Sequence, residues 1–311
     1  MAFTVVPMHN LVLPPDSEVV FGDGFVLKEL PLWVTEEQML KNLSYTDRQS
    51  IPLAKCALMA DYEAASIGEP DPSAAPGDPK SIQGRKFNAV LLANFALWLA
   101  QPSKACFTTV FHGLHWDVPG QSNKQPIIQQ IERQNPMYCH PAEVANTVSL
   151  EQANEAGRFH AVLLSVPRKN PVWRAMRMYW AGLTNSAADI RYSLFWIGLE
   201  ALFGPDGNTG EITYKLSQRA AFFISNTPQD ARDVFGKAKK CYAMRSKIVH
   251  GLWEYDPSID ITMADTEMIV RASCRRLLTD PEMLKTFMSK KRDQFLEEWV
   301  FSRSTDTPPF P

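Results

Sequence analysis

An arginine and a histidine stand close together in the segment CYAMRSKIVHGLW, Cys241 to Trp253. Four residues separate Arg245 from His250, and Gly251 follows the histidine directly. An arginine is permanently charged and can hold a phosphate through two parallel hydrogen bonds. A histidine with a pKa near about 6.5 can accept or donate a proton at neutral pH. Together, the two residue types are suited to chemistry at a phosphate ester.

These residues lie at the end of a predicted helix that has Thr227 as its N-cap and Pro228 in its first turn. On a wheel of about 100° per residue, Arg245 falls within an apolar stripe. The stripe consists of Val234, Ala238, Cys241, Ile248 and Val249. Solvated arginines normally occupy the opposite face of a helix. A purely structural interpretation is that Arg245 extends out of the core or pairs with a carboxylate such as Glu200.

The position of His250 requires an interruption of this helix. An unbroken helix would direct the side chains of Arg245 and His250 about 140° apart. Gly251 belongs to the residue type preferred just after a helix end, because glycine tolerates a left-handed conformation. We therefore expect His250 to leave the regular wheel and turn back towards Arg245. Alternatively, His250 is a structural residue whose charged form interacts with the helix dipole.

The same segment is locally basic. Six cations and one acid lie between Arg232 and His250, although the whole chain has a net charge of −2. The cations are Arg232, Lys237, Lys239, Lys240, Arg245 and Lys247, and the acid is Asp233. The overall charge excludes a protein evenly coated with positive charge, so a nucleic acid would have to contact a local patch. A charge run is most often a solvated face, but beside this arginine and histidine it also suits a polyanion.

The segment resembles the HEPN domain, a family of helical bundles whose ribonuclease members carry an arginine shortly before a histidine. RSKIVH matches this pattern with four intervening residues. The surrounding segments LFWIGLEALFG, YKLSQRAAFFI and YAMRSKIVHG resemble the Apea-like branch of the family, over roughly Pro171–Phe301. The resemblance implies a metal-independent endoribonuclease without a cofactor, often assembled at a homodimer interface. It further implies a role in antiviral defence or as a toxin, with the amino-terminal part responding to a protein or ligand trigger.

The implied reaction assigns roles to particular residues. RNA carries its own nucleophile, the 2′-hydroxyl, with which His250 would exchange a proton, as it could with the leaving 5′-oxygen. Arg245 would stabilise the charge that develops on the phosphate. The products would be a 2′,3′-cyclic phosphate and a 5′-hydroxyl, and DNA would resist cleavage. The residues that we expect to contact RNA are Lys237, Lys240, Tyr242, Ser246 and Lys247.

Other functions remain open at this point. The same bundle could bind RNA, a nucleotide or a protein without cleavage, because a fold does not determine a function. It could also serve only as a dimerisation scaffold. Large apolar residues in the segments VWRAMRMYWAGL and LFWIGLEALF, including Trp173, Trp180 and Trp196, predict a homodimer interface in the helical part.

Two further motifs were weighed as ligand sites. Zinc could be held by a set drawn from Cys106, His112, His115, Cys139 and His140. We expect ordinary histidines instead, because positions three apart on a strand point to opposite faces. The loop GPDGNTG, Gly204–Gly210, lacks the Gly-Lys-Ser/Thr ending of a phosphate-binding loop and is interpreted as a helix connection.

The chain as a whole predicts a reduced, cytoplasmic protein. Its five cysteines are scattered and form no Cys-x-x-Cys pair, which argues against a disulfide framework or a zinc ribbon. The start MAFTVVPMHN lacks the pattern of a signal peptide. The longest apolar stretch, Phe87–Ala100, has 14 residues and is too short to cross a bilayer, so we expect a buried element and no membrane contact.

These residues are expected to be positioned by an α+β fold in two parts. Residues 1–148 form a mixed, β-rich domain with strands in FTVVP, SEVVFGDGFVLKEL and ACFTTVFHGL, and with a hairpin turn at Gly22–Gly24. Residues 149–311 form an all-α, HEPN-like helical bundle. Three of its predicted helices have N-caps at Ser149, Ser186 and Thr227, and another begins at Pro171. Two more lie near Met263–Thr279 and Pro281–Phe301.

Overall fold

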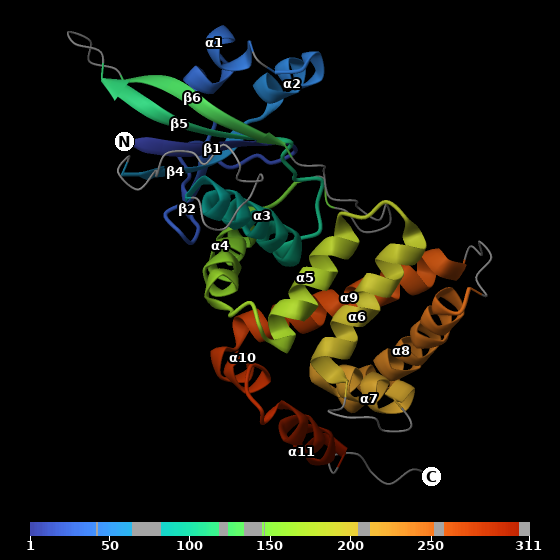
Figure 1. The fold of residues 1–311 in the computed structure, drawn as a ribbon. Coiled ribbons are helices and arrows are strands. Elements are labelled where there is room, and N and C mark those ends of the chain that lie inside the picture. Colours follow the sequence, from blue (N-terminus) through green and yellow to red (C-terminus); the bar gives the residue numbers. More distant parts are fainter. Residues whose placement is uncertain are drawn as a thin grey trace. The chain divides into compact units, whose positions relative to one another are not determined.

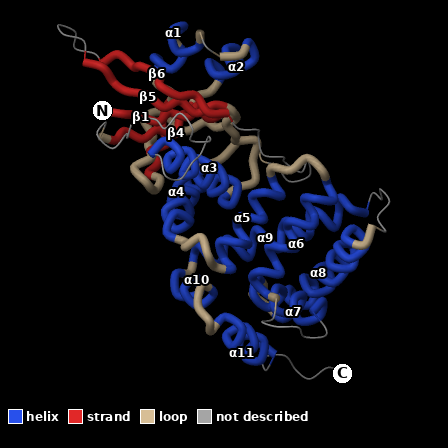
Figure 2. The backbone as a smooth tube through the Cα atoms, in the orientation of Figure 1, coloured by secondary structure: helices blue, strands red, loops and turns tan. Residues whose placement is uncertain are grey.

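The computed structural model divides the chain into two compact units, Met1–Ser165 and Val166–Pro311 (Figure 1). The residues that it describes are 1–41, 43–63, 82–117, 124–133, 145, 147–204, 212–251 and 258–304. The first unit contains an antiparallel sheet together with helices, and the second unit is helical (Figure 2). The predicted α+β class is therefore confirmed.

The first unit is built on a six-stranded antiparallel sheet with the order β2-β3-β4-β1-β5-β6. The strands are β1 (Ala2–Met8), β2 (Val19–Val20), β3 (Val26–Glu29), β4 (Cys56–Tyr62), β5 (Thr109–Asp117) and β6 (Lys124–Arg133). Strand β1 pairs with β4 on one side and β5 on the other, and all seven of its residues are buried. A strand buried on both faces needs a covering layer on each face.

Short helices cover one face of this sheet. They are η1 (Leu32–Thr35), α1 (Glu37–Leu40), α2 (Tyr45–Ser50) and η2 (Ile51–Leu53). Phe3 and Val5, two positions apart on β1, pack there against Val34 and Ile51. The longer helix α3 (Ile82–Ala100) lies on the other side of the sheet from α1 and α2 (Figure 1). Residues 87–100, predicted as a buried element, belong to α3.

The predicted hairpin at Gly22–Gly24 is confirmed. Strands β2 and β3 pair antiparallel, with Val19 opposite Leu27 and Val20 opposite Val26. Asp23 and Gly24 have φ values of 60° and 75°. Two successive residues with positive φ are characteristic of the tight turns that match the twist of a hairpin, and aspartate and glycine are favoured there.

Helix α4 (Leu150–Ser165) belongs to the first unit, whereas the sequence analysis began the second domain at residue 149. Its predicted N-cap is confirmed, since the Ser149 hydroxyl accepts a hydrogen bond from the Gln152 N–H at 3.2 Å. Local capping rules do not reveal what a helix packs against. Helix α4 packs against α3 and β2, and its Gly157 lies directly against the backbone of Val20.

Replacing Gly157 with alanine should lower the free energy of unfolding of the first unit by about 1–3 kcal/mol. The new Cβ would lie 2.2 Å from the backbone oxygen of Val20, so the helix would have to move. The matched control is Gly236→Ala in the second unit, where no atom lies within 4 Å of the added Cβ. That change should stabilise its helix by about 0.5–1 kcal/mol. Urea unfolding of both variants checks the pair, and a stabilising Gly157→Ala change would contradict the packing of α4 on β2.

The described elements of the second unit are all helices. They are α5 (Pro171–Leu183), α6 (Ala188–Phe203), α7 (Ile212–Ile224), α8 (Pro228–Val249), α9 (Ser258–Thr279), α10 (Pro281–Phe287) and α11 (Arg292–Ser304). Helix α6 packs against α5, α7, α8 and α9 and is therefore apolar on nearly all sides. Trp196, on this helix, is 0% exposed, so it fills the core of a single chain and supplies no surface for the predicted dimer interface.

Two predicted helix boundaries in this unit are wrong. The N-cap of α6 is Ala187, not Ser186. Alanine has no polar side-chain atom, so the helix lacks a side-chain capping hydrogen bond. The Arg191 guanidinium instead binds the carbonyl oxygens of Asn185 and Ser186 and so holds the start of the helix. The predicted helix Pro281–Phe301 is two helices, α10 and α11. No helix in the described part of the chain is both long and apolar enough to cross a membrane.

Candidate functional site

Helix α8 carries both predicted catalytic residues, and its two ends are as predicted. The Thr227 hydroxyl accepts a hydrogen bond from the Asp230 N–H at 3.1 Å, and Pro228 occupies the first turn. The helix ends at Val249 with His250 as its C-cap, and Gly251 follows with φ 68°. This left-handed glycine is the expected signal for the end of a helix.

One face of α8 is fixed to α6 by three contacts, which we call the inner contacts. The three α6 residues are four positions apart and therefore lie in a row along one side of the helix. The contacts are Tyr192 with Cys241, Trp196 with Tyr242, and Glu200 with Arg245. Such a row fixes both the position of α8 along α6 and its rotation about its own axis.

Each inner contact has a different chemical nature. The Tyr192 hydroxyl donates a hydrogen bond to the carbonyl oxygen of Cys241 at 2.8 Å. The rings of Trp196 and Tyr242 meet edge to face, with their centroids 5.1 Å apart. The third contact is the ion pair of Glu200 and Arg245.

Arg245 is therefore bound by a carboxylate. Its Nη2 lies 2.9 Å from Oε1 of Glu200, and its side chain is 23% exposed. The guanidinium also lies 5.6 Å from the centre of the Tyr242 ring. Burial raises the pKa of Glu200, while the charges of Arg245 and Arg174 lower it. The pairing of Arg245 with Glu200, which is the purely structural interpretation of this arginine, is thus present.

His250 does not turn back towards Arg245 within one chain. Its N–H donates to the carbonyl oxygen of Ser246 at 3.1 Å, which is the hydrogen bond of a regular helix. Its φ of −87° is negative, and only its ψ of 7° departs from the helical value. The left-handed residue is Gly251, one position too late to redirect the histidine side chain. His250 therefore lies about 140° around the helix from Arg245 and is exposed. No hydrogen bond or ion pair joins the two residues in the part of the chain that the structure describes.

His250 shares its side of α8 with four exposed cations. We call this surface the basic face of α8. It comprises Arg232, Lys239, Lys240, Lys247 and His250. On the helical wheel these five positions fall within an arc of about 100°, on the side away from Arg245. The spacing of seven residues from Arg232 to Lys239 brings the chain back almost to the same side, which is the sequence signal for this face.

The structure separates the residues predicted to contact RNA. Lys240 and Lys247 lie on the basic face with His250. Tyr242 lies with Arg245 at the inner contacts, and Ser246 is half-buried. Lys237 forms an ion pair with Asp265 on α9, with 2.9 Å between Nζ and Oδ1.

The histidines weighed as zinc ligands point away from each other. The Nδ1 atom of His112 lies 2.9 Å from the Thr4 hydroxyl, and the ring of His115 packs against Phe3. Thr4 and Phe3 are neighbours on β1, and neighbouring residues of a strand face opposite sides. The two histidines that contact them therefore lie on opposite faces of the sheet. Cys139 and His140 lie outside the described residues. Within the described ranges, no group of three or more metal-binding side chains occurs.

No protein-family model, curated protein or solved structure matches this chain.

Proposed function

We propose that the helical unit is a metal-independent endoribonuclease of the HEPN type. The observation that carries this proposal is the basic face of α8, on which four exposed cations lie on the same side as His250. Cations in a row attract the phosphates of a nucleic acid, and the exposed imidazole can reach the ribose beside a bound phosphate. The resemblance of RSKIVH and its surroundings to HEPN ribonucleases supports the same assignment.

The proposed reaction needs neither a metal nor an added nucleophile. A base removes the proton of the 2′-hydroxyl, whose oxygen attacks the adjacent phosphorus. The bond from phosphorus to the 5′-oxygen breaks, and the leaving oxygen takes up a proton. His250 serves as the acid or base for one of these transfers. The products are a 2′,3′-cyclic phosphate and a 5′-hydroxyl.

Arg245 requires a second chain in this proposal. Because Arg245 and His250 point to different sides of α8, one RNA phosphate cannot readily lie between them in a single chain. We propose that the active form is a homodimer in which Arg245 of one chain and His250 of the other face the same RNA strand. Glu200 then orients the guanidinium through the ion pair.

A binding module without catalysis is the second candidate. It is favoured by the same ion pair, since an arginine neutralised by Glu200 and distant from His250 is suited to a structural role. In this case the basic face of α8 would hold RNA, a nucleotide or an acidic protein segment without cleaving it.

The deciding assay uses purified protein, a mixed-sequence RNA and a DNA of the same sequence, in the presence of EDTA. We expect cleavage of the RNA alone, with cyclic phosphate ends, because only RNA supplies the 2′-hydroxyl. RNA that binds but stays intact would favour the binding module. RNA that does not bind would exclude the ribonuclease and an RNA-binding module, and would leave a nucleotide or an acidic protein segment as the ligand of the basic face.

The basic face can be tested in the same assay. A Lys240→Gln/Lys247→Gln variant should bind RNA more weakly, and the slope of its salt dependence should fall by about 1.4 for single strands. Cleavage at saturating RNA should change little, because these contacts act equally on the ground state and the transition state. The control is Lys285→Gln/Lys290→Gln, which removes two exposed charges from the same unit away from α8. An equal loss of affinity in both variants would show that only net charge matters.

A further inference from the structure

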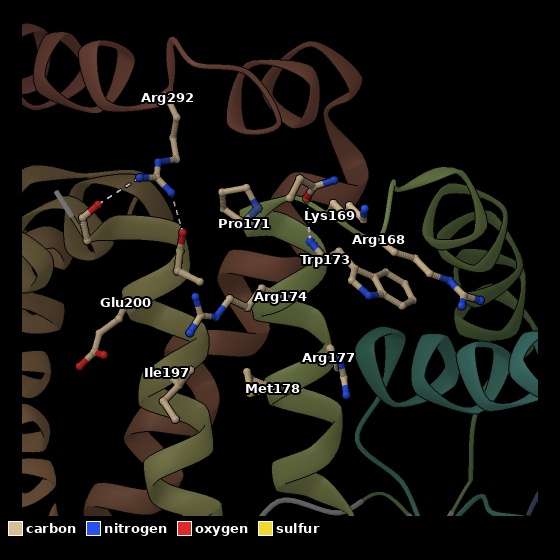
Figure 3. A pocket seen from close by; sticks show the side chains of 13 residues that line it. Arg168, Lys169, Pro171, Trp173, Arg174, Arg177, Met178, Ile197, Glu200 and Arg292 are labelled. Carbon is tan, nitrogen blue, oxygen red and sulfur yellow. Dashed lines mark hydrogen bonds between the residues drawn. The ribbon is translucent and has the colours of Figure 1, made fainter. Parts of the chain in front are cut away.

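The second unit contains a pocket whose described lining residues include none from α8. The pocket has a volume of about 720 Å³ and lies at α5, α6 and the start of α11 (Figure 3). Five of its lining residues are cations, and we call it the cationic pocket. They are Arg168, Lys169, Arg174, Arg177 and Arg292.

The described residues that line the cationic pocket carry more positive than negative charge. Among them Glu200 is the one carboxylate, and it is already paired with Arg245. Within the described residues, Arg168, Lys169 and Arg177 form no ion pair with a carboxylate. Like charges that line one pocket repel each other, so a multiply charged anion bound among them would be stabilised.

Arg292 supplies a buried charge at the pocket wall. Its side chain comes from α11 and is 8% exposed. It donates hydrogen bonds to the carbonyl oxygens of Ala201 at 2.7 Å and Gly204 at 3.3 Å, as Figure 3 shows. These carbonyls form the carboxyl-terminal end of α6, which carries the negative end of the helix dipole. Arg292 offsets that negative end, so the adjoining wall does not repel an anion.

Arg174 contributes a charge from the opposite wall. Figure 3 shows its side chain directed from α5 towards α6, near Ile197 and Glu200. Arg177 follows three residues later on the same helix, about one turn away. The amino-terminal end of α5, at Pro171, also lies at the pocket and adds the positive end of that helix dipole.

We propose that the cationic pocket binds a small anion that carries two or more phosphate groups. Its volume lies within the range of about 300–1,000 Å³ that is usual for small-molecule sites. A single phosphate would neutralise only part of the charge that the four exposed cations provide. Such a ligand is either an inorganic oligophosphate or a nucleoside oligophosphate, since both present the same charged groups. The proposal does not depend on ribonuclease activity, because it uses none of the residues of α8.

The test is calorimetric titration of the full-length protein with sodium tripolyphosphate and, separately, with ATP, at constant ionic strength and without RNA. We expect saturable binding of at least one of them. An Arg174→Gln/Arg177→Gln variant should weaken it at least tenfold, because both residues are exposed and line the pocket. The control variant Lys285→Gln/Lys290→Gln loses the same number of charges outside the pocket and should bind as the wild type does.

The outcomes distinguish a nucleotide ligand from an inorganic oligophosphate, and they also decide whether the pocket binds either. Tighter binding of ATP than of tripolyphosphate would indicate a nucleotide, and equal binding would indicate an oligophosphate. Absence of saturable binding of both anions at millimolar concentration would overturn the proposal. So would an equal loss of affinity in the pocket variant and the control variant. A thermal unfolding scan of each variant confirms that it is folded.

Discussion

Replacing His250 with alanine is expected to slow RNA cleavage at saturating RNA by about 10²–10⁴-fold. The imidazole is the proposed acid or base, and alanine cannot transfer a proton. His250 is exposed at the end of α8, so its removal should leave the fold unchanged. Single-turnover cleavage measures the chemical step, and circular dichroism checks the fold. The comparison variant is Lys247→Ala on the same basic face, which should weaken binding far more than it slows cleavage.

Arg245 needs a variant that preserves its surroundings. Removing the arginine alone would leave Glu200 partly buried without its partner, which is destabilising. A Glu200→Gln/Arg245→Gln variant removes both charges together and keeps two amide groups in place. We expect it to bind RNA but to cleave it at least 100-fold more slowly, because the neutral amide stabilises the phosphate charge less well. Wild-type cleavage by this variant would remove Arg245 from the mechanism.

A mixing experiment distinguishes a site within one chain from a site between two chains. In a mixed dimer of the His250→Ala chain and the Glu200→Gln/Arg245→Gln chain, one site would contain an intact arginine and an intact histidine. Random mixing should then restore roughly a quarter of the wild-type rate. No restoration after subunit exchange would contradict the shared site. A particle of 35.1 kDa in light scattering at micromolar concentration would also do so, because that is the mass of a single chain.

Replacing Phe203 with alanine is expected to lower the free energy of unfolding of the second unit by about 3–5 kcal/mol. Its side chain is 0% exposed, and its ring contacts those of Phe223 on α7 and Phe287 on α10. The change would leave a cavity where three helices meet, and the surrounding rings could fill it only in part. Urea unfolding measures the loss of unfolding free energy. Hydrogen exchange of the backbone amides in α6 and α7 then assigns this loss to the second unit.

Phe301→Ala is the matched control for this core substitution. Phe301 is 72% exposed on α11, so its truncation should change stability by no more than about 0.5 kcal/mol. If the two phenylalanines gave similar losses, the meeting point of α6, α7 and α10 could not be the centre of the core.

Local patterns predict the elements that carry the candidate site. Thr227, Pro228 and Gly251 determine where α8 begins and ends through hydrogen bonds and backbone preferences that involve only their neighbours in sequence. The sequence Gly22–Gly24 determines the hairpin for the same reason. Short segments rich in valine, phenylalanine and threonine likewise predict β1 and β5.

What depends on distant parts of the chain could not be predicted in this way. The direction of the His250 side chain depends on which residue has the left-handed φ. It is Gly251 in the structure, whereas a left-handed φ at residue 250 would be needed to turn the histidine towards Arg245. The assignment of α4 depends on a close approach between Gly157 and Val20. The break between α10 and α11 contains neither glycine nor proline, and the side chain of Arg292 at the start of α11 binds the end of α6. The basic segment RKNPVWRAMR signals the cationic pocket only once Arg292 is known to lie beside it.

Glu200 belongs both to the lining of the cationic pocket and to the ion pair with Arg245. Its carboxylate holds Arg245, so two otherwise separate places on the unit share one residue. A thermodynamic cycle connects them. Whatever factor an occupant of the pocket applies to the affinity at Arg245, an occupant at Arg245 must apply to the affinity of the pocket. If the pocket and Arg245 each bind a ligand as proposed, Glu200 is the residue through which one ligand would affect the binding of the other.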